Sequence, residues 1–220
     1  MSFLPPIRKP LLCYVTNRGA LRVSARAPEK LLLAKIEQAA KAGVDWIQLR
    51  EKDLSGKQLV ELVSEAVRIT SGASAILIND RLDVACAAEA AGVHLGEQSL
   101  PVKEAKRLAA ERVAEKSFLV GASVHSLETA QQAEQAGASY VIFGPVFATP
   151  SKASFGEPQG LERLREVCRK LQIPVLAIGG IVLEDAQDCL DAGAGGIAAI
   201  RLFQESHDLP EVVKRLRSGL

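Results

Sequence analysis

Aromatic residues are scarce in this sequence of 220 residues, and neither sign of charge is in excess. Aromatic side chains make up 4% of the chain and hydrophobic residues 48%, so the core must be built mainly from aliphatic side chains. The 27 Lys and Arg residues nearly balance the 26 Asp and Glu residues, which leaves a formal net charge of +1. This balance argues against nucleic-acid binding through a large basic excess and against an acidic disordered chain.

Long apolar runs and paired cysteines are also missing. No run of about 18 apolar residues is present, so we expect no membrane span. The first ten residues contain three prolines and no apolar segment, which argues against a secretory signal. The four cysteines, Cys13, Cys86, Cys168 and Cys189, form no CxxC pair and lie in apolar patterns. They indicate buried reduced thiols in a cytoplasmic protein rather than a disulfide or a metal site.

Short apolar runs alternate along the chain with longer amphipathic segments. The runs are continuously apolar, which is typical of parallel strands covered by helices. The predicted strands are 12–15, 46–49, 75–78, 93–95, 119–122, 140–143, 175–178 and 196–200. The predicted helices are 30–42, 56–69, 82–90, 102–114, 127–136, 161–171, 183–192 and 209–217.

An Ala-Gly pair precedes four of these strands, with the glycine at Gly43, Gly92, Gly137 and Gly193. Glycine after a helix accepts the left-handed conformation that ends it, so the repeat indicates one recurring αβ unit. Eight such units in 220 residues predict a single α/β domain, a (β/α)8 TIM barrel over residues 11–220. Residues 1–10 are expected to form an N-terminal arm across its bottom. The alternative is an open doubly wound sheet, although no GxGxxG follows the first strand.

Polar residues follow nearly every predicted strand, where a TIM barrel places its active site. Gln48, Arg50 and Lys52 alternate along an extended segment and therefore point to the same side. Two cations and an amide suit a polyanion such as pyrophosphate, the alternative being a surface charge run that forms local pairs. Asp80 follows an apolar strand and is a candidate Mg²⁺ ligand or, alternatively, a cap of the next helix.

Glycine-rich turns and one long loop complete this rim. Gly179-Gly180 and Gly195-Gly196 flank the last two units, where backbone N–H groups of this fold often bind phosphate. The segment 144–160 carries hydroxyl groups and Lys152, which suit a lid that closes over phosphates, or else a solvated loop. His94 is expected inside the barrel and His125 at the start of the fifth helix. The sequence contains no His/Cys cluster of the kind that binds zinc.

Six rim segments, one for each of six strand ends, resemble the thiamine-phosphate synthase family and the related thiazole tautomerases over residues 11–217. They are Gln48-x-Arg50-x-Lys52, Ile78-Asn79-Asp80-Arg81, Gly92-Val93-His94-Leu95-Gly96, Gly121-x-Ser123-x-His125-Ser126, Phe143-Gly144-Pro145-Val146-Phe147-x-Thr149-x-Ser151-Lys152 and Ala177-Ile178-Gly179-Gly180-Ile181. The resemblance implies a transferase that joins hydroxymethylpyrimidine diphosphate to a thiazole phosphate, releasing pyrophosphate and forming thiamine phosphate.

The resemblance also implies roles by position. The pyrimidine diphosphate would be held by Gln48, Arg50, Lys52 and Asn79, with Asp80 binding Mg²⁺. Ser123 and Lys152 would contact the departing pyrophosphate, and with Arg50 they are the expected catalytic residues. The thiazole phosphate would be held by Thr149, Ser151, Gly180, Ile200 and Arg201. The expected partners are thus phosphorylated small molecules, without nucleic acid or membrane, and the sequence leaves open whether the chain is a homodimer.

Three positions depart from the synthase pattern. Ser99 replaces a second acidic Mg²⁺ ligand, Arg201 replaces a small serine, and residues 155–159 continue the long loop in an unusual way. A thiazole tautomerase is the first alternative, because proton transfer on a thiazole carboxylate phosphate needs no diphosphate site. One tautomerase pattern, however, has histidine where this chain has Pro145. A non-catalytic binder of a phosphorylated thiamine precursor is the second alternative.

Overall fold

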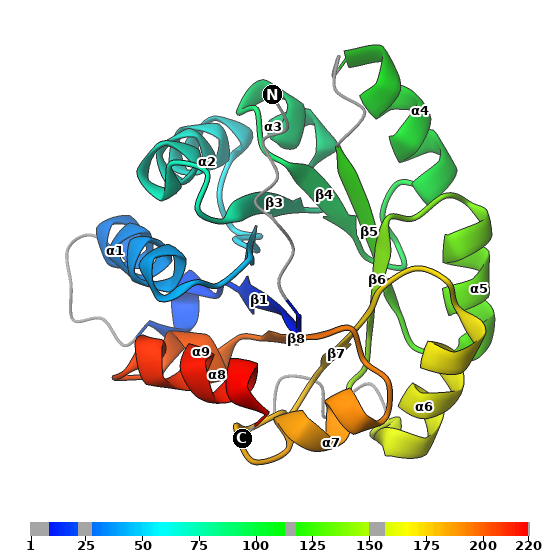
Figure 1. Ribbon diagram of the computed structural model, residues 1–220. Helices are drawn as coiled ribbons and strands as arrows, with labels where there is room; N and C mark the ends of the chain where they lie inside the picture. Colours follow the sequence, from blue (N-terminus) through cyan, green and yellow to red (C-terminus); the bar gives the residue numbers. More distant parts are fainter. Residues whose placement is uncertain (1–8, 22–27, 113–117, 150–156, 220) are drawn as a thin grey trace.

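The computed structural model describes residues 9–21, 28–112, 118–149 and 157–219, and its strands form one closed parallel barrel (Figure 1). The strands, β1 to β8, are Leu11–Val15, Trp46–Leu49, Ala75–Asn79, Gly92–Leu95, Leu119–Val124, Tyr140–Phe143, Val175–Ile178 and Gly196–Ala199. Neighbours in the chain are neighbours in the sheet, and β8 returns to pair with β1, with Ile197 opposite Leu12. The predicted TIM barrel is confirmed, and the open sheet is excluded.

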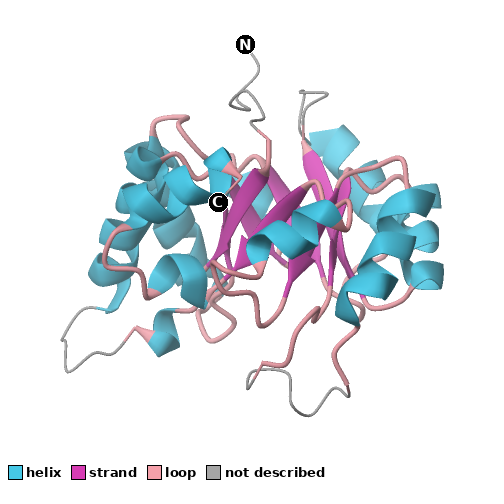
Figure 2. Ribbon diagram, turned by 60° about the horizontal axis from the view of Figure 1, so that its bottom comes forward, coloured by secondary structure: helices cyan, strands magenta, loops and turns pink. Residues whose placement is uncertain are grey.

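Helices form a ring outside the barrel (Figures 1 and 2). They are α1 Pro28–Ala42, α2 Gly56–Thr70, α3 Leu82–Ala87, α4 Val102–Arg112, α5 Leu127–Gln135, α6 Gly160–Lys170, α7 Ala186–Asp191, α8 Arg201–Gln204 and α9 Leu209–Ser218, with a short 3-10 helix η1 at Arg18–Ala20. The sequence did not predict η1 or α8, and α3 and α7 end earlier than predicted. None of the helices in the described residues is long and apolar enough to cross a membrane.

The strands bury both of their faces, which explains why they read as continuous apolar runs. Side chains on the outer face, such as Leu12 and Ile47, pack with the helices in one large cluster. The inner face forms a second cluster that fills the barrel: Leu11, Cys13, Val15, Trp46, Ala75, Leu77, Tyr140, Ile142, Leu176 and Ala198. The barrel interior is therefore packed through most of its depth, and space for a ligand lies at its ends.

The repeated Ala-Gly pair ends helices at three of the four positions where it occurs. Gly43, Gly137 and Gly193 have φ values of +93°, +91° and +101°, as the left-handed end of a helix requires. Gly92 instead lies within β4, where a Cβ atom would be 2.2 Å from the carbonyl oxygen of Leu119. Its prediction as a helix terminator was wrong, because close approach of β5 is what demands glycine there.

A buried ion pair joins the C-terminal helix to the start of the barrel. Arg217 of α9 donates from Nη2 to the carboxylate of Asp45 at 2.7 Å and to the carbonyl of Gly43 at 3.0 Å. The same carboxylate oxygen accepts the backbone N–H of Leu12 in β1 at 2.8 Å. The Asp45 side chain is 6% exposed and that of Arg217 is 17% exposed, so solvent screens this ion pair only weakly. This ion pair thus joins β1, the segment 43–45 before β2 and the helix α9 at the amino ends of the strands.

We expect the substitution Arg217→Met to lower the free energy of unfolding by about 3 kcal/mol, because it leaves a buried carboxylate without its cation. Urea denaturation followed by circular dichroism measures the change. Lys214→Met is the matched control on the same helix, since Lys214 pairs with Glu211 at 3.4 Å and is 75% exposed. The control should cost less than about 0.5 kcal/mol. Equal losses in the two variants would contradict the role given to Arg217.

Candidate active site

The loops that follow the carboxyl ends of the strands gather at one end of the barrel, the lower end in Figure 2. The inner face of the strands becomes polar as this end is approached. Gln48, Asn79, His94 and Ser123 occupy the positions that would continue the apolar cluster of the interior. Four neighbouring strands, β2 to β5, therefore supply a polar floor to the mouth of the barrel, as expected for the active site of this fold.

Gln48 is buried and has hydrogen-bonding capacity left over. Its Nε2 donates to Oδ1 of Asn79 at 3.2 Å, which fixes the two amides relative to each other. Its Oε1 is buried and has no partner within the described residues. An unpaired buried acceptor is costly, so this oxygen is suited to receive a donor from a ligand in the mouth.

The acidic residues next to Arg50 and Lys52 are paired elsewhere. Glu51, 5% exposed, accepts the hydroxyl of Thr16 at 2.6 Å and the backbone N–H of Arg18 at 3.0 Å. Burial raises the pKa of Glu51, and these hydrogen bonds oppose that shift. The Arg18 guanidinium also pairs with Asp53. The charge run from 50 to 53 therefore does not pair internally, and this alternative to a binding role is excluded.

Arg50 and Lys52 keep their charge available at the mouth. The described residues contain no ion-pair partner for either side chain. The backbone N–H of Arg50 donates to the Thr16 hydroxyl at 3.0 Å, and Thr16 in turn is held by Glu51. The main chain below the Arg50 guanidinium is therefore fixed through a buried carboxylate, while the guanidinium itself remains without a counter-ion among the described residues.

Asp80 lies directly after β3 and is exposed, with φ of +70°. It does not cap α3, whose N-cap is Arg81 and which has no side-chain capping bond. Arg81 pairs instead with Asp83 at 2.6 Å. The capping alternative is thus wrong for Asp80, because its carboxylate makes no capping hydrogen bond to α3.

The described residues offer no complete metal site made of protein ligands. They contain no group of three His, Cys, Asp or Glu side chains that could hold a metal ion. Ser99, at the position of the missing second acid, uses its Oγ to accept the backbone N–H of Gly96 at 2.7 Å. Mg²⁺ commonly binds through one or two carboxylates and completes its shell with water and substrate phosphates. Asp80 fits Mg²⁺ as one such carboxylate, provided that a phosphorylated ligand supplies further oxygens.

His94 and Ser123 meet below the mouth. Nε2 of His94 is 2.9 Å from Oγ of Ser123, and Nδ1 is 3.1 Å from the hydroxyl of Tyr140. Burial, with a contribution from the positive charge of Arg50, lowers the pKa of His94 to about 3. His94 is therefore neutral and lies inside the barrel, as predicted. His125 precedes α5 as expected and contacts the carbonyl of Gly144 through Nδ1.

The long loop after β6 is tied to the turn after β7. Val146 and Phe147 donate their backbone N–H groups to Ile178 and Gly179 at 2.8 and 2.9 Å. Gly180 has φ of +69°, and a Cβ atom there would lie 2.5 Å from the carbonyl oxygen of Ala148. Gly180 therefore permits a contact that no other residue allows. Thr149 at the edge of the loop is half-buried, whereas Ser151 and Lys152 lie outside the described residues.

A single turn of helix, α8, follows β8 and begins at Arg201 with Ile200 as its N-cap. The first N–H groups of a helix have no partner within it, so those of α8 are available at the rim. The side chain of Gln204 anchors this turn to β1, because its Oε1 accepts the Tyr14 hydroxyl at 2.9 Å and its Nε2 donates to the carbonyl of Asn17 at 2.9 Å. Arg201 itself is exposed.

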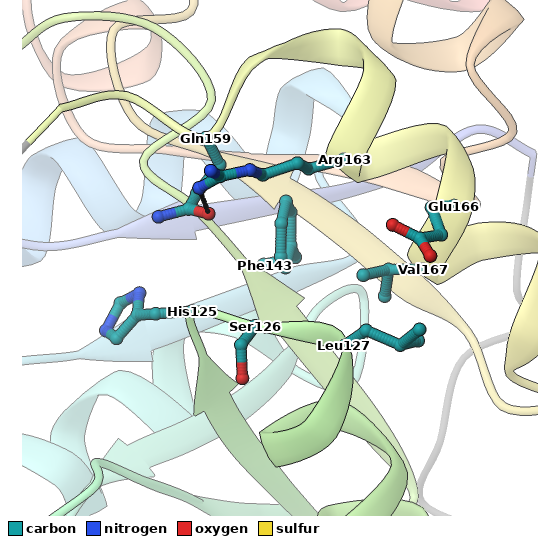
Figure 3. Close-up of a pocket in the computed structure, with 8 residues that line it drawn as sticks. All are labelled: His125, Ser126, Leu127, Phe143, Gln159, Arg163, Glu166 and Val167. Atoms are coloured by element: carbon teal, nitrogen blue, oxygen red, sulfur yellow. Dashed lines mark hydrogen bonds between the residues drawn. The ribbon is translucent and has the colours of Figure 1, made fainter.

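A separate cavity of about 180 Å³ lies between the beginnings of α5 and α6 (Figure 3). It is lined by His125, Ser126, Leu127, Phe143, Gln159, Arg163, Glu166 and Val167. Arg163 donates to Gln159 across its rim at 3.0 Å. None of the residues that the resemblance assigns to the substrates or to Mg²⁺ lines this cavity.

The fold is a (β/α)8 barrel, and its polar rim lies at the carboxyl ends of the strands, where enzymes of this class have their active sites. The family model described as "Thiamine monophosphate synthase" matches residues 12–203, and the chain belongs to this family. The thiamine-phosphate synthases of Methanoculleus marisnigri and Methanosarcina barkeri are 43% and 40% identical, each over 83% of this chain and over 84% and 80% of their own length.

Solved structures agree with the family. Thiamine phosphate pyrophosphorylase from Pyrococcus furiosus superposes with a TM-score of 0.80 at 32% identity, covering 96% of this chain and 95% of its own. The chain therefore belongs to the thiamine-phosphate synthase family of transferases, as the rim motifs led us to expect. The comparisons lend no support to the thiazole tautomerase or to the non-catalytic binder.

Contacts among the described residues join a few of the predicted site residues, and they bring in supporting residues that the sequence did not single out. Gln48 and Asn79 are in contact, and His94 links Ser123 to the interior. The supporting residues are Thr16, Arg18, Glu51, Tyr140 and Gln204. Only Glu51 could have been noticed in the sequence, as an acid between two cations. Its partners Arg18 and Thr16 lie 33 and 35 positions earlier in the chain, so the sequence alone does not identify them.

We expect Gly180→Ala to lower the free energy of unfolding by at least about 2 kcal/mol, from its positive φ and from the contact with Ala148. Gly72→Ala is the control, because Gly72 has φ of +77° and a Cβ atom added there would meet nothing within 4 Å. It should cost only the backbone penalty of roughly 1 kcal/mol. Chemical denaturation of both variants measures the two losses in the free energy of unfolding. Equal losses would show that the close contact of Gly180 with Ala148 does not require glycine.

Proposed function

We propose that this chain forms thiamine phosphate by coupling hydroxymethylpyrimidine diphosphate with a thiazole phosphate at the mouth of the barrel. One observation carries the proposal: Arg50 and Lys52 lie just beyond the end of β2, the strand that carries the buried Gln48, while the acids beside them are paired with other residues. Two such cations beside an unsatisfied amide suit a diphosphate joined to a polar ring. Membership of the synthase family supports the same substrates.

In the proposed complex the pyrimidine ring lies over Gln48 and Asn79, and the diphosphate lies toward Arg50 and Lys52. The open Oε1 of Gln48 is available to accept a donor on the ring. Ser123 and Lys152 contact the departing pyrophosphate. The thiazole phosphate binds at the backbone of Gly180, Ile200 and Arg201. Thr149 is assigned to the same phosphate by the family resemblance, as is Ser151, which lies outside the described residues.

The reaction exchanges one bond for another at the pyrimidine methylene carbon. Its bond to the diphosphate oxygen breaks, the leaving oxygen keeps the electron pair, and the thiazole nitrogen forms the new bond to carbon. The electron-rich pyrimidine tolerates the positive character that develops on this carbon. Arg50, with Lys152 and Ser123, takes up the negative charge that develops on the departing pyrophosphate. Holding the thiazole nitrogen close to the carbon supplies the proximity that the reaction needs.

Asp80 is the residue that would hold Mg²⁺ together with the diphosphate. A bound Mg²⁺ would neutralise charge on the leaving group, in addition to the cations of the protein. Because Asp80 is a single carboxylate, the ion depends on the oxygens of the diphosphate for its affinity. Ser99 stands at the position of the second acidic ligand, and its Oγ accepts the backbone N–H of Gly96, so this position supplies no carboxylate to the ion.

We further propose that the enzyme works in the cytoplasm on phosphorylated small molecules. Cys13 and Cys189 are buried, and burial raises the pKa of each thiol to about 12. Unreactive buried thiols are usual in a reducing compartment.

We expect Arg50→Ala to lower kcat/KM for coupling at least about 100-fold, because the developing charge on pyrophosphate loses a cation. The fold should persist, since it is the backbone N–H of residue 50 that binds Thr16. Thiamine phosphate is followed by fluorescence after oxidation. Arg107→Ala is the matched control, because Arg107 on α4 pairs only with Glu104 and Glu111 among the described residues. Turnover by Arg50→Ala equal to that of the control would overturn the role of Arg50.

Mg²⁺ should bind tightly only when a diphosphate is present. In isothermal titration, Mg²⁺ added to the protein alone should give affinity in the millimolar range or weaker, and saturating inorganic pyrophosphate should strengthen it at least about tenfold. Asp80→Asn should abolish this gain, whereas Asp83→Asn, which removes the partner of Arg81, should retain it. Tight binding without pyrophosphate, or an undiminished gain in Asp80→Asn, would count against Asp80 as the ligand.

A further inference from the structure

Three polar side chains form a chain of contacts from the packed interior to the mouth of the barrel. The Tyr140 hydroxyl on β6 is 3.1 Å from Nδ1 of His94 on β4, and Nε2 of His94 is 2.9 Å from Oγ of Ser123 on β5. Tyr140 is 0% exposed and His94 is 2% exposed, whereas Ser123 is half-buried at the mouth. The direction of the hydrogen bonds in this chain decides where the hydroxyl hydrogen of Ser123 points.

Tyr140 is held in one position by its neighbours. Its ring packs against Trp46, with ring centroids 4.6 Å apart. On another side it fills the space above Gly121, where a Cβ atom would lie 2.1 Å from Cζ of the tyrosine. Because Tyr140 cannot move away, its hydroxyl must find its hydrogen-bond partner where it lies.

The Tyr140 hydroxyl acts as a donor. In the part of the chain that the structure describes, its hydrogen-bond partner is Nδ1 of His94 alone. If Nδ1 carried a proton and donated to the tyrosine oxygen, the hydroxyl hydrogen would be buried without an acceptor, which is costly. Donation from Tyr140 to Nδ1 avoids this cost and leaves the single proton of a neutral imidazole on Nε2.

The proton on Nε2 then determines the role of Ser123. Nε2–H donates to Oγ of Ser123, so the serine cannot direct its own hydrogen at His94. The neutral state that this requires agrees with the lowered pKa of the buried ring, which also lies in the field of Arg50. The serine hydrogen is left to point toward the mouth.

We propose that Tyr140 and His94 are positioning residues that hold Ser123 as a hydrogen-bond donor toward the departing pyrophosphate. This inference rests on the proposed function for the identity of the acceptor. The tautomer itself follows from contacts within the protein. With the opposite tautomer, the serine would donate to Nε2 and would present only lone pairs to an anion, which would repel it.

Nuclear magnetic resonance tests the tautomer without any substrate or variant. The chain has three histidines, so two-bond ¹⁵N–¹H spectra of ¹⁵N-histidine-labelled protein contain few signals to assign. We expect His94 at neutral pH to show the Nε2–H tautomer. Observation of the Nδ1–H tautomer, or of an imidazolium, would overturn the proposal whatever the enzyme's activity.

The substitution Tyr140→Phe tests the origin of this preference, because it keeps the ring and removes the donor to Nδ1. The spectrum of His94 should change from the Nε2–H form to a mixture of tautomers. Tyr14→Phe is the matched control: Tyr14 is also buried, and its hydroxyl donates to Gln204 at 2.9 Å rather than to a histidine. It should leave the His94 signals unchanged. A Tyr140→Phe spectrum identical to wild type would show that the tyrosine does not set the tautomer.

Coupling kinetics test the consequence for Ser123. Tyr140→Phe should lower kcat about tenfold, the size expected for a misdirected hydrogen bond to a charged group, with KM for the pyrimidine diphosphate changed less than about twofold. In a Ser123→Ala background, Tyr140→Phe should have no further effect on kcat. Additive losses would indicate a merely structural role and overturn the proposal. Absence of coupling by the wild type would instead contradict the proposed function, while the spectra would still decide the tautomer.

Discussion

Pairing of β8 with β1 closes the sheet, and closure leaves no strand with an unpaired edge. One face of each strand packs against helices and the other fills the barrel, so polar side chains on the strands are confined mainly to the last inward positions. Gln48, Asn79, His94 and Ser123 occupy those positions on four consecutive strands. The site is therefore a consequence of closure: the strand ends bring together residues that lie far apart in the sequence.

The separation of opposite charges is the second feature on which the site depends. Glu51 and Asp53 alternate with Arg50 and Lys52 along the chain, yet the two acids are paired with Arg18 and Thr16. This arrangement fixes the backbone of the rim segment and leaves two cations for an anionic ligand. The same buried carboxylate thus stabilises the loop after β1 and prevents the cations beside it from being neutralised.

The sequence predicts the barrel well because its signals are local. Continuous apolar runs locate all eight strands, most of them to within one or two residues. The rim residues follow from the strand ends, since parallel strands in a barrel all finish at one side. Gln48 could be assigned an inward direction from its place in an apolar strand, and the structure confirms that it is buried.

The remaining features depend on contacts between distant segments. The short turn α8 has no side-chain capping bond and is held by Tyr14 through Gln204, a contact across 190 positions. Glu51 cannot be recognised as a structural residue until Arg18 is placed beside it. Gly92 has the sequence context of a helix terminator, but the neighbouring strand β5 is what requires it. Direct tertiary contact overrides local pattern in each of these cases.

The central claim is that this rim couples a pyrimidine diphosphate to a thiazole phosphate. The most direct test supplies purified wild-type protein with both substrates and Mg²⁺, and quantifies thiamine phosphate and pyrophosphate in the same sample. Our account predicts that the two products accumulate in equal amounts and that a chelator stops both. Folded protein that binds the thiazole phosphate but forms neither product under these conditions would contradict it.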